Sequence, residues 1–321
     1  MGQVISFLLD NGLPFVFENV PEDDVNRLRF EFMERRRRMG EVLRLKAEQL
    51  VVSDEPLVYM KKQPYKYQKQ AVQFFEICDG KAILGDQPGV GKTCSAFSYA
   101  AKHQYKTLVV CPASLKLSWR NEILDFTNEK PFIYKFKPKK KSKIQAFKKE
   151  ESLFHIINYE SLETYFKLEY KHVCKGRRLV PGKGHQPCGA EIIDLTKKHK
   201  ECPICKSQNS FKSRLVGLQG FSDKFNEIID TDEYDLIVID EFHRIKEKTT
   251  GWTQIIREAF RDKIPRKILL SGTGIKSRPA ELFVALNFID PKSWNNQHEF
   301  GVRYCAGFED NFGWKYDGAS N

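Results

Sequence analysis

Residues 85–93 read Gly-Asp-Gln-Pro-Gly-Val-Gly-Lys-Thr and directly follow the apolar run Ala82-Ile83-Leu84. A glycine-rich loop between a buried strand and a helix turns its backbone N–H groups toward phosphates, and the N-terminus of the helix adds the positive end of its dipole. This arrangement is typical of a site for a nucleoside triphosphate. The residues expected to hold the nucleotide are Gly89, Val90, Gly91, Lys92 and Thr93.

The last two residues of this loop have distinct expected roles. Lys92 is expected to reach the β- and γ-phosphates, and the Thr93 hydroxyl is expected to ligate Mg²⁺. Two neighbours depart from the general pattern, since Asp86 stands where glycine is usual and Pro88 removes one N–H donor. Taken alone, the loop therefore leaves a plain glycine-rich turn open as an alternative.

A second motif supplies carboxylates. Residues 235–243 read Asp-Leu-Ile-Val-Ile-Asp-Glu-Phe-His, and their four consecutive apolar residues indicate a strand buried on both faces. Asp240 and Glu241 then lie at the C-terminal end of that strand, where open α/β sheets bind ligands. We expect Asp240 to hold Mg²⁺ through water and Glu241 to orient or deprotonate the attacking water. An ordinary acidic turn is the alternative, and the loop upstream argues against it.

A third apolar strand at residues 267–270 runs into Ser271-Gly272-Thr273-Gly274. Small hydroxyl residues at this point can bond to the loop that carries Asp240 and Glu241, and can thereby report the state of the γ-phosphate. Ser-Gly-Thr-Gly alone is only a turn, so its value comes from its order along the chain.

The spacing of the apolar stretches predicts the fold class. The chain of 321 residues is long enough for one large α/β domain or two smaller ones. Apolar stretches that alternate with helical patterns are the signature of a parallel sheet flanked by helices. Five such stretches occur, at residues 81–84, 107–111, 153–157, 236–239 and 267–270.

In this order the motifs resemble those of the first motor lobe of superfamily 2 helicases and translocases of the Swi/Snf type, from about residue 60 to the C-terminus. The resemblance implies a RecA-like P-loop lobe that binds ATP and Mg²⁺ and acts as a DNA-dependent ATPase. Asp86 is usual in this family, whose loop reads Asp-Glu-Met-Gly-Leu-Gly-Lys-Thr. The segments similar to the Q motif and to motifs I, Ia, Ib, II and III are residues 65–68, 86–93, 111–115, 158–160, 240–243 and 271–274.

The resemblance also implies roles for single residues. Gln68 is the expected reader of adenine, while His243 and Thr273 are expected to pass the state of the γ-phosphate toward the DNA side. There Ser114 and the segment 158–160 are expected to contact the phosphates of a DNA strand. The expected catalytic residues are Lys92, Asp240, Glu241 and His243.

The C-terminal part is most similar to the annealing-helicase (HARP-like) branch, whose members remodel forked DNA. The similar segments are residues 271–273, 277–282, 303–305 and 313–314. Phe242 replaces the usual small residue of motif II and Gly274 replaces the usual proline of motif III, without removing an atom that touches ATP or Mg²⁺. Trp119, behind motif Ia, is expected to be a core residue of its helix rather than a base-stacking one.

The family's second lobe, which supplies arginine fingers, should follow motif III, and the sequence stops soon after Trp314-Lys315-Tyr316. Because an arginine finger contributes roughly a thousandfold or more in rate, we expect this lobe alone to bind nucleotide weakly and hydrolyse it poorly. A longer enzyme or a second polypeptide would complete it. An ATP-responsive DNA-binding module without turnover is the alternative. A kinase-like P-loop enzyme is disfavoured, because motifs Ia and III would have no function there.

The composition favours a polyanionic partner. The chain carries 53 Lys and Arg against 42 Asp and Glu, a net charge of +11. This surplus fits double-stranded or forked DNA, and a domain with many surface lysines is the alternative. No run of about 18 apolar residues predicts a membrane span, and the N-terminus lacks the basic region of a secretory signal. We therefore expect a cytoplasmic protein, of a phage or bacterial host, or a nuclear one in a eukaryote.

Two segments are expected along the chain. Residues 1–58 form an N-terminal helical extension, in which residues 25–50 predict a long helix with either a solvated or a nucleic-acid-binding face. Residues 59–321 form the ATP-binding lobe, with a cysteine-rich insertion at about 165–212. Residues 135–149 carry eight lysines and no acid, which fits a groove that tracks a DNA backbone and a flexible surface loop equally well.

The insertion has the composition of a small zinc-knuckle-like site. Cys202-Pro-Ile-Cys205 has knuckle spacing, Cys174 and Cys188 form a looser second half, and His185 is an alternative ligand. The segment is too polar to bury a core of its own, so a structural Zn²⁺ would supply the missing stability. The alternative is four reduced cysteines in a loop, since disulfides are rare in a reducing compartment.

Overall fold

The computed structural model describes residues 56–134, 147–194, 200–208, 211–221, 229–245, 250–272, 279–310, 313–316 and 318. The predicted helix at 25–50, residues 135–146 of the lysine-rich segment, and Thr273 with Gly274 lie outside the described residues. The outcomes of the predictions below concern the described part of the chain.

A six-stranded sheet forms the centre of the lobe, with the strand order β1-β11-β10-β2-β4-β3. The strands are β1 (Lys81–Leu84), β2 (Thr107–Cys111), β3 (Phe132–Ile133), β4 (Phe154–Asn158), β10 (Leu236–Asp240) and β11 (Arg266–Leu270). Every neighbouring pair runs parallel. The predicted α/β fold with a parallel sheet is confirmed, and the short β3 is an addition that the sequence did not predict.

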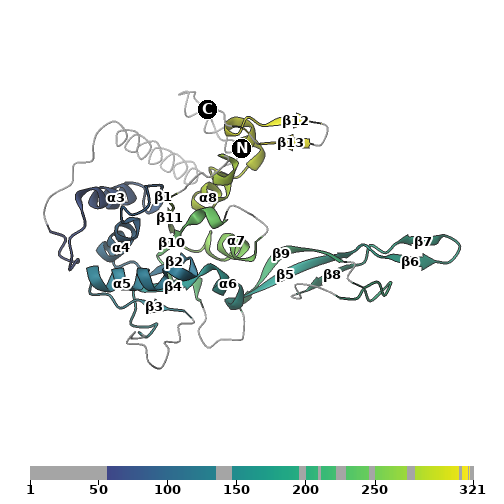
Figure 1. Ribbon diagram of the computed structural model, residues 1–321, viewed down its shortest axis with the longest axis horizontal. Helices are drawn as coiled ribbons and strands as arrows, with labels where there is room; N and C mark the ends of the chain where they lie inside the picture. Colours follow the sequence, from purple (N-terminus) through teal and green to yellow (C-terminus); the bar gives the residue numbers. More distant parts are fainter. Residues whose placement is uncertain are drawn as a thin grey trace, which may run out of the picture.

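Helices cover both faces of this sheet (Figure 1). Along β10, Ile237 and Ile239 pack into one core whereas Leu236 and Val238 pack into the other, so a continuous apolar run is buried on both faces. The core around Val238 takes side chains from α3 (Lys66–Ile77), α4 (Lys92–His103) and α5 (Lys116–Phe126). The opposite core takes side chains from α6 (Tyr159–Tyr165), α7 (Gly251–Ile255) and α8 (Leu282–Ile289).

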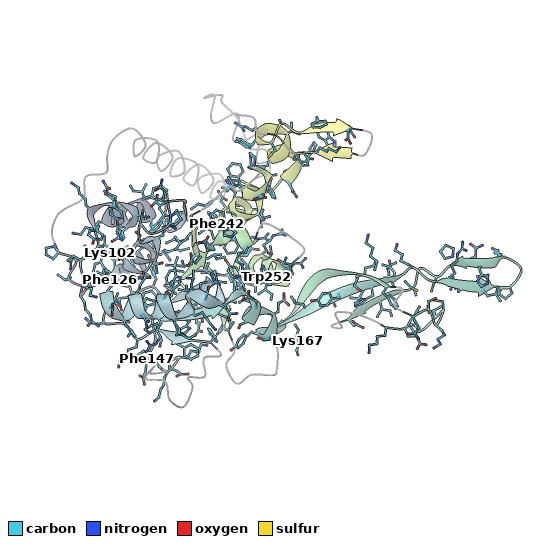
Figure 2. The ribbon with its side chains drawn as sticks, viewed as in Figure 1. Lys102, Phe126, Phe147, Lys167, Phe242 and Trp252 are labelled. Atoms are coloured by element: carbon cyan, nitrogen blue, oxygen red, sulfur yellow. The ribbon has the colours of Figure 1, made fainter. Side chains whose placement is uncertain are left out.

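A long antiparallel arm leaves the lobe after α6 (Figures 1 and 2). Its strands β5 (Phe166–Cys174), β8 (Glu191–Asp194) and β9 (Phe211–Phe221) form a sheet of order β8-β5-β9. Beyond this sheet, β6 (Arg177–Val180) and β7 (Gly184–Pro187) form a separate hairpin. At the base, Phe166 and Leu168 are buried in the core of the lobe, and the Phe166 ring packs edge-on against Phe260 at 5.6 Å. The arm is therefore attached to the lobe by packing as well as by the chain.

The remaining elements complete the C-terminal side. Helix α9 (Gln297–Tyr304) and the hairpin of β12 (Phe308–Asp310) and β13 (Gly313–Lys315) follow α8, around a small core of Phe283, Phe300 and Cys305. Among the described helices, none combines the length and apolarity that a bilayer crossing needs. Single helical turns occur at Ala113–Leu115, Thr231–Glu233, Phe242–Ile245, Ile256–Phe260 and Pro279–Glu281.

Candidate nucleotide-binding site and cysteine cluster

The sheet register brings the glycine-rich loop and the acid pair to one edge. Leu84, the last residue of β1, is opposite Leu270, and Leu270 is opposite Asp240 on the next strand. Because all three strands are parallel and end at the same level, the loop after Leu84, Ser271 and Asp240 leave the sheet side by side. Burial raises the pKa of Asp240, and the charge of Lys92 acts in the opposite direction, as expected of a nearby cation. The sheet thus joins the two motifs that the sequence separates by almost 150 residues.

Glycines shape the loop where other residues would strain it. Gly89 and Gly91 have φ angles of 85° and 78°, in the left-handed region that L side chains rarely adopt. A Cβ atom at Gly91 would lie 2.2 Å from Nε2 of Gln68, whereas one at Gly89 would meet nothing within 4 Å. Gly91 is therefore required twice, by its backbone conformation and by the close approach of Gln68.

Gln68 uses both ends of its amide inside the protein. Its Oε1 accepts from the backbone N–H of Tyr65, at the start of α3, and its Nε2 donates to the carbonyl of Val90 at 3.0 Å. The side chain is 5% exposed. Gln68 thus connects the start of α3 to the glycine-rich loop, and its reading of adenine stays a prediction.

The Lys92 side chain folds back across its own loop. Its ammonium donates to the carbonyl oxygens of Asp86 at 2.8 Å and Gln87 at 3.0 Å. A triphosphate held by this loop has to exchange these two bonds for bonds to phosphate oxygens. The exchange is chemically favourable, because phosphate oxygens carry charge and the carbonyl oxygens do not.

Asp240 is a buried carboxylate with two aromatic neighbours. Trp119 Nε1 on α5 donates to its Oδ2 at 2.8 Å, and the Tyr159 hydroxyl donates to its backbone carbonyl at 2.7 Å. Burial raises the pKa of Asp240 above its ordinary value, and the bond from Trp119 opposes that rise. Trp119 is buried, as expected, and in addition it orients the carboxylate.

Glu241 connects this strand end to β11. Its Oε2 accepts from Ser271 Oγ at 3.1 Å, which is the contact expected of a hydroxyl residue in this loop. His243 Nδ1 lies 3.1 Å from the same carboxylate oxygen and 3.3 Å from Ser271 Oγ. The φ of Glu241 is 55°, a conformation that costs a non-glycine residue on the order of 1–3 kcal/mol. The surrounding contacts hold the carboxylate in this strained position.

The loop after β11 also packs against the glycine-rich loop. A Cβ atom at Gly272 would lie 2.8 Å from Cγ of Pro88. Pro88, which departs from the general loop pattern, therefore lies directly against Gly272. The two motifs are in contact through these residues.

A second set of contacts leads from the acid pair toward β4. Arg244 pairs with Glu160 at 3.1 Å, and its guanidinium lies over the rings of Tyr159 and Trp252. Glu160 also accepts from the Asn158 amide at 2.9 Å. The segment expected to touch a DNA strand is thereby tied directly to the residues that follow Glu241.

Ser114 and Phe242 occupy very different environments at this edge. Ser114 is exposed in the turn after β2, where a ligand at the carboxyl edge of the sheet can reach it. Phe242 is 2% exposed and packs in the core with Ile245, so the large side chain that departs from the family pattern points away from the site.

The oxygen donors at this edge suit Mg²⁺. A hydroxyl from Thr93 and a carboxylate from Asp240 are hard oxygen ligands, and Mg²⁺ normally keeps several waters beside one or two such groups. The buried and partly charge-compensated Asp240 fits this role better than an exposed acid would, because a cation would offset the cost of its burial.

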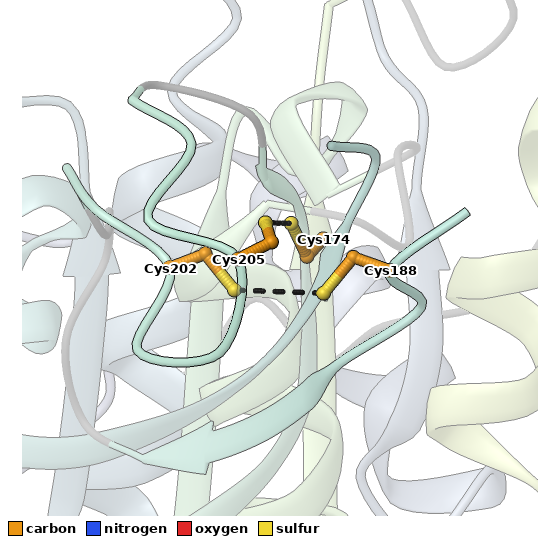
Figure 3. A group of neighbouring side chains, drawn as sticks. All are labelled: Cys174, Cys188, Cys202 and Cys205. Carbon is orange, nitrogen blue, oxygen red and sulfur yellow. Dashed lines mark hydrogen bonds between the residues drawn. The ribbon is translucent and has the colours of Figure 1, made fainter. Parts of the chain in front are cut away.

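The four cysteines of the insertion converge at the junction of the arm and its hairpin (Figure 3). Their Sγ atoms all lie within 4.8 Å of one another. Cys174 and Cys205 are 3.5 Å apart, and Cys188 and Cys202 are 3.8 Å apart. A tetrahedral Zn²⁺ with bonds of about 2.3 Å places its sulfur ligands about 3.8 Å apart. The geometry of the cluster therefore fits zinc.

The surroundings of the cluster favour the thiolate form of Cys205 and the thiol form of Cys174. Hydrogen bonding with Ser207 lowers the pKa of Cys205 to about 6, whereas burial raises the pKa of Cys174 to about 12. The backbone N–H of Gly176 donates to Cys174 Sγ at 3.3 Å, as happens around metal-bound thiolates. His185 is exposed on β7 and is not part of the group. The cysteine set, and not the histidine alternative, is the one that the fold assembles.

A model of the SNF2-related domain matches residues 67–312. The chain belongs to this family. The match covers motifs I, Ia, Ib, II and III and enters the Q motif at Tyr67.

Named relatives are longer proteins. A Caenorhabditis elegans homolog of SWI/SNF-related matrix-associated actin-dependent regulator of chromatin subfamily A-like protein 1 is 27% identical over 261 residues, which are 80% of this chain and 28% of that protein. The Mus musculus DNA annealing helicase and endonuclease ZRANB3 is 24% identical over 79% of this chain and 19% of its own length. The chain thus spans between about a fifth and a little over a quarter of these relatives.

A solved structure titled Sulfolobus solfataricus SWI2/SNF2 ATPase core in complex with dsDNA is also similar. It is 20% identical with a TM-score of 0.47, over 81% of this chain and 42% of that one.

Two contacts of this SNF2-related domain were not predicted from its sequence. The bonds from Trp119 and Tyr159 to Asp240 join residues that are 121 and 81 positions apart. Their aromatic side chains match the apolar pattern of a core, and nothing in that pattern shows that each ring also carries a donor aimed at the acid. A buried Trp or Tyr generally has a partner for its polar atom, which is the one signal that was available.

Proposed function

We propose that this chain is the first motor lobe of an ATP-dependent DNA helicase or translocase. The observation that carries the proposal is the junction at one sheet edge of the glycine-rich loop, the Asp240–Glu241 pair and Ser271. Such a junction lets a single triphosphate be bound, polarised and sensed by three neighbouring loops.

Each residue at this edge has a defined task in the proposal. Lys92 exchanges its two loop carbonyls for phosphate oxygens, and Thr93 and Asp240 would hold Mg²⁺. The ion, when bound, neutralises charge on the β- and γ-phosphates. Glu241 positions the attacking water and accepts a proton from it, and its contacts with Ser271 and His243 hold the carboxylate in place.

The proposal includes a route from the nucleotide to DNA. Ser271 and His243 both contact Glu241, so a change at the γ-phosphate alters their bonds. Arg244, the residue after His243, pairs with Glu160 in the segment that follows β4. That segment and Ser114 are the proposed contacts to the phosphates of a DNA strand.

A partner lobe is part of the proposal. The relatives are several times longer than the matched region, and a second RecA-like lobe would supply arginine fingers to the γ-phosphate. The lobe on its own should therefore bind nucleotide and turn it over slowly. The location, in a bacterial or phage-host cytoplasm or a eukaryotic nucleus, stays a prediction and suits the eight described cysteines, which form no disulfide with one another.

Nucleotide binding and DNA-stimulated phosphate release test the proposal together. A fluorescent ADP analogue with Mg²⁺ should bind the wild-type chain and the Glu241→Gln variant, and should lose binding in Lys92→Ala. With the sequence downstream restored, the wild type should release phosphate faster with DNA, and Glu241→Gln should not. An absence of nucleotide binding would overturn the proposal. Binding with no DNA-stimulated release would favour the ATP-responsive module.

We also propose that Cys174, Cys188, Cys202 and Cys205 hold one structural Zn²⁺. Four protein ligands leave no open position, so the ion would hold the arm together and would not take part in catalysis. Metal analysis of protein purified without chelator should find about one zinc per chain. Cys202→Ser should lose it, while Cys78→Ser, outside the cluster, should keep it. Equal zinc contents in the two variants would contradict the assignment.

A further inference from the structure

The hairpin at the end of the arm exposes almost all of its surface. In β6 and β7, Arg177 is opposite Pro187, Arg178 opposite Gln186 and Leu179 opposite His185. All eight residues of the two strands are exposed, apart from the half-buried Val180. Leu179 is 70% exposed. Figures 1 and 2 show the hairpin projecting past β5, β8 and β9, away from the lobe.

Such a hairpin contributes little to the fold. A two-stranded hairpin is marginally stable at best in water without a third strand or a packed face. This hairpin instead depends on its neck, the segments 174–176 and 188–190 that precede β6 and follow β7. There the Cys188 N–H donates to the Gly176 carbonyl at 2.8 Å, and the Cys174 N–H donates to the Ala190 carbonyl at 2.9 Å. The neck therefore supports a hairpin whose side chains are almost all exposed.

The charge on the hairpin is of one sign. Residues 175–190 contain four cationic side chains, Lys175, Arg177, Arg178 and Lys183, and no carboxylate. Within the described residues, none of these four forms an ion pair. Arginines without a nearby acid keep their guanidinium donors available to an anionic partner.

The rest of the arm is different in this respect. Lys171 pairs with Glu191 at 2.6 Å, and Lys206 lies 3.9 Å from Glu201. Two cations in the body of the arm thus have acidic partners, whereas within the described residues no cation of the hairpin has one.

We infer that the β6–β7 hairpin is a second contact to duplex DNA, separate from the contacts proposed at the sheet edge. This inference rests on the proposed function, in which DNA is the partner of the lobe. The major groove of B-DNA is about 12 Å wide and admits a two-stranded β-ribbon, whereas the major groove of A-form RNA is deep and narrow. Arg177 and Arg178, being consecutive in a strand, point to opposite faces and can reach the phosphates on the two sides of a groove.

Salt-dependent binding of a labelled DNA duplex, measured by anisotropy without nucleotide, tests the hairpin. Each phosphate neutralised contributes about 0.9 to the slope of log K against log salt concentration. Arg177→Ala/Arg178→Ala should therefore flatten the slope by about 2 and weaken binding at least about tenfold at 0.1 M salt. Arg177→Lys/Arg178→Lys should keep the wild-type slope, because it keeps both charges.

The matched control is Lys171→Ala/Lys206→Ala, which removes the same charge from the paired cations of the same arm. It should leave the slope close to that of the wild type. The inference is overturned if the alanine pair at Arg177 and Arg178 keeps the wild-type slope, or if the control flattens it equally. It is also overturned if only duplex RNA shows the effect, or if the lysine pair behaves like the alanine pair.

The outcome is independent of the nucleotide site. Binding of the fluorescent ADP analogue to the wild-type chain tests the motor separately. A chain that needs Arg177 and Arg178 for DNA but binds no nucleotide would keep the hairpin contact and overturn the motor function. A chain that binds nucleotide and DNA without needing these arginines would do the reverse.

Discussion

The bond from Trp119 to Asp240 gives the sharpest test of the nucleotide site. Trp119→Phe removes the N–H that donates to Asp240 Oδ2 at 2.8 Å and keeps an aromatic ring in the core. The carboxylate is 7% exposed and loses a donor to its charged oxygen. The change should weaken the binding of Mg²⁺-nucleotide, because a ligand carboxylate needs such partners to stay oriented.

The expected loss of nucleotide affinity follows from the role of Trp119 as a donor to the Asp240 carboxylate. A hydrogen bond to a charged group contributes about 1.5–3 kcal/mol. Loss of a partner that orients a metal ligand typically costs about 10–100-fold in metal affinity, which corresponds to about 1.4–2.8 kcal/mol. The two ranges agree, so we expect the Mg²⁺-dependent part of nucleotide affinity to fall by about 10–100-fold. The free energy of unfolding without nucleotide should also fall, since a buried carboxylate is left unpaired and a smaller ring leaves a cavity.

Tyr159→Phe is the matched control. It removes a donor of similar geometry, at 2.7 Å, from the backbone carbonyl of the same Asp240. The free energy of unfolding should fall by about 1 kcal/mol, with little change in the dependence of binding on Mg²⁺. Titration of the fluorescent ADP analogue with and without Mg²⁺, beside urea unfolding, separates the two effects. Equal losses of Mg²⁺-dependent affinity in both variants, or none in Trp119→Phe, would refute the reasoning.

Three further outcomes can be measured on the same chain. Burial lowers the pKa of His155 to about 4, so the contribution of its neutral form to the free energy of unfolding is complete above about pH 6.5 and is lost as the pH falls toward 4. In urea unfolding, the free energy of unfolding of the wild type should therefore fall by about 3 kcal/mol more than that of His155→Gln over this range. Parallel pH curves for the two proteins would refute this prediction. Gly91→Ala should abolish binding of the ADP analogue, because the new Cβ atom would collide with Gln68. Gly89→Ala has a similarly strained φ but open space, so it should cost about 1–2 kcal/mol in the free energy of unfolding and keep weak binding. A similar loss of binding in both variants would show that the Gln68 contact is irrelevant. Ser271→Ala should lower DNA-stimulated phosphate release in the two-lobe protein and leave nucleotide affinity unchanged, and normal release would remove Ser271 from the coupling route.

The sequence predicts the sheet well because its strands are buried on both faces. The apolar run before Asp240 has one structural interpretation at that length, and its parallel neighbours β2 and β11 have similar runs. Parallel strands end at one edge, so the meeting of the loop and the acid pair followed from the motif order. Strand β3, with two residues, is too short to show any periodicity.

The arm is the part of the fold that sequence patterns could not predict. Its strands β5 and β9 carry mixed polar side chains, and one pairs with the other across a long separation with register shifts near Leu168 and Tyr170. Cysteine spacing predicted a metal site there but contained no information about a ribbon. The sequence indicated ligands, whereas the antiparallel pairing that carries them depends on contacts between Phe166–Cys174 and Phe211–Phe221.

The firm attachment of the arm has a mechanical consequence. Strand β5 spans nine residues, about 30 Å at 3.3 Å per residue, and begins where α6 ends. The first residue of α6, Tyr159, holds the carbonyl of Asp240. A tilt of α6 by about 10° would swing the far end of β5 by about 5 Å, more than the rise of one base pair, about 3.4 Å. A small tilt of α6, which contacts the acid pair, would therefore produce a larger displacement at the far end of the arm.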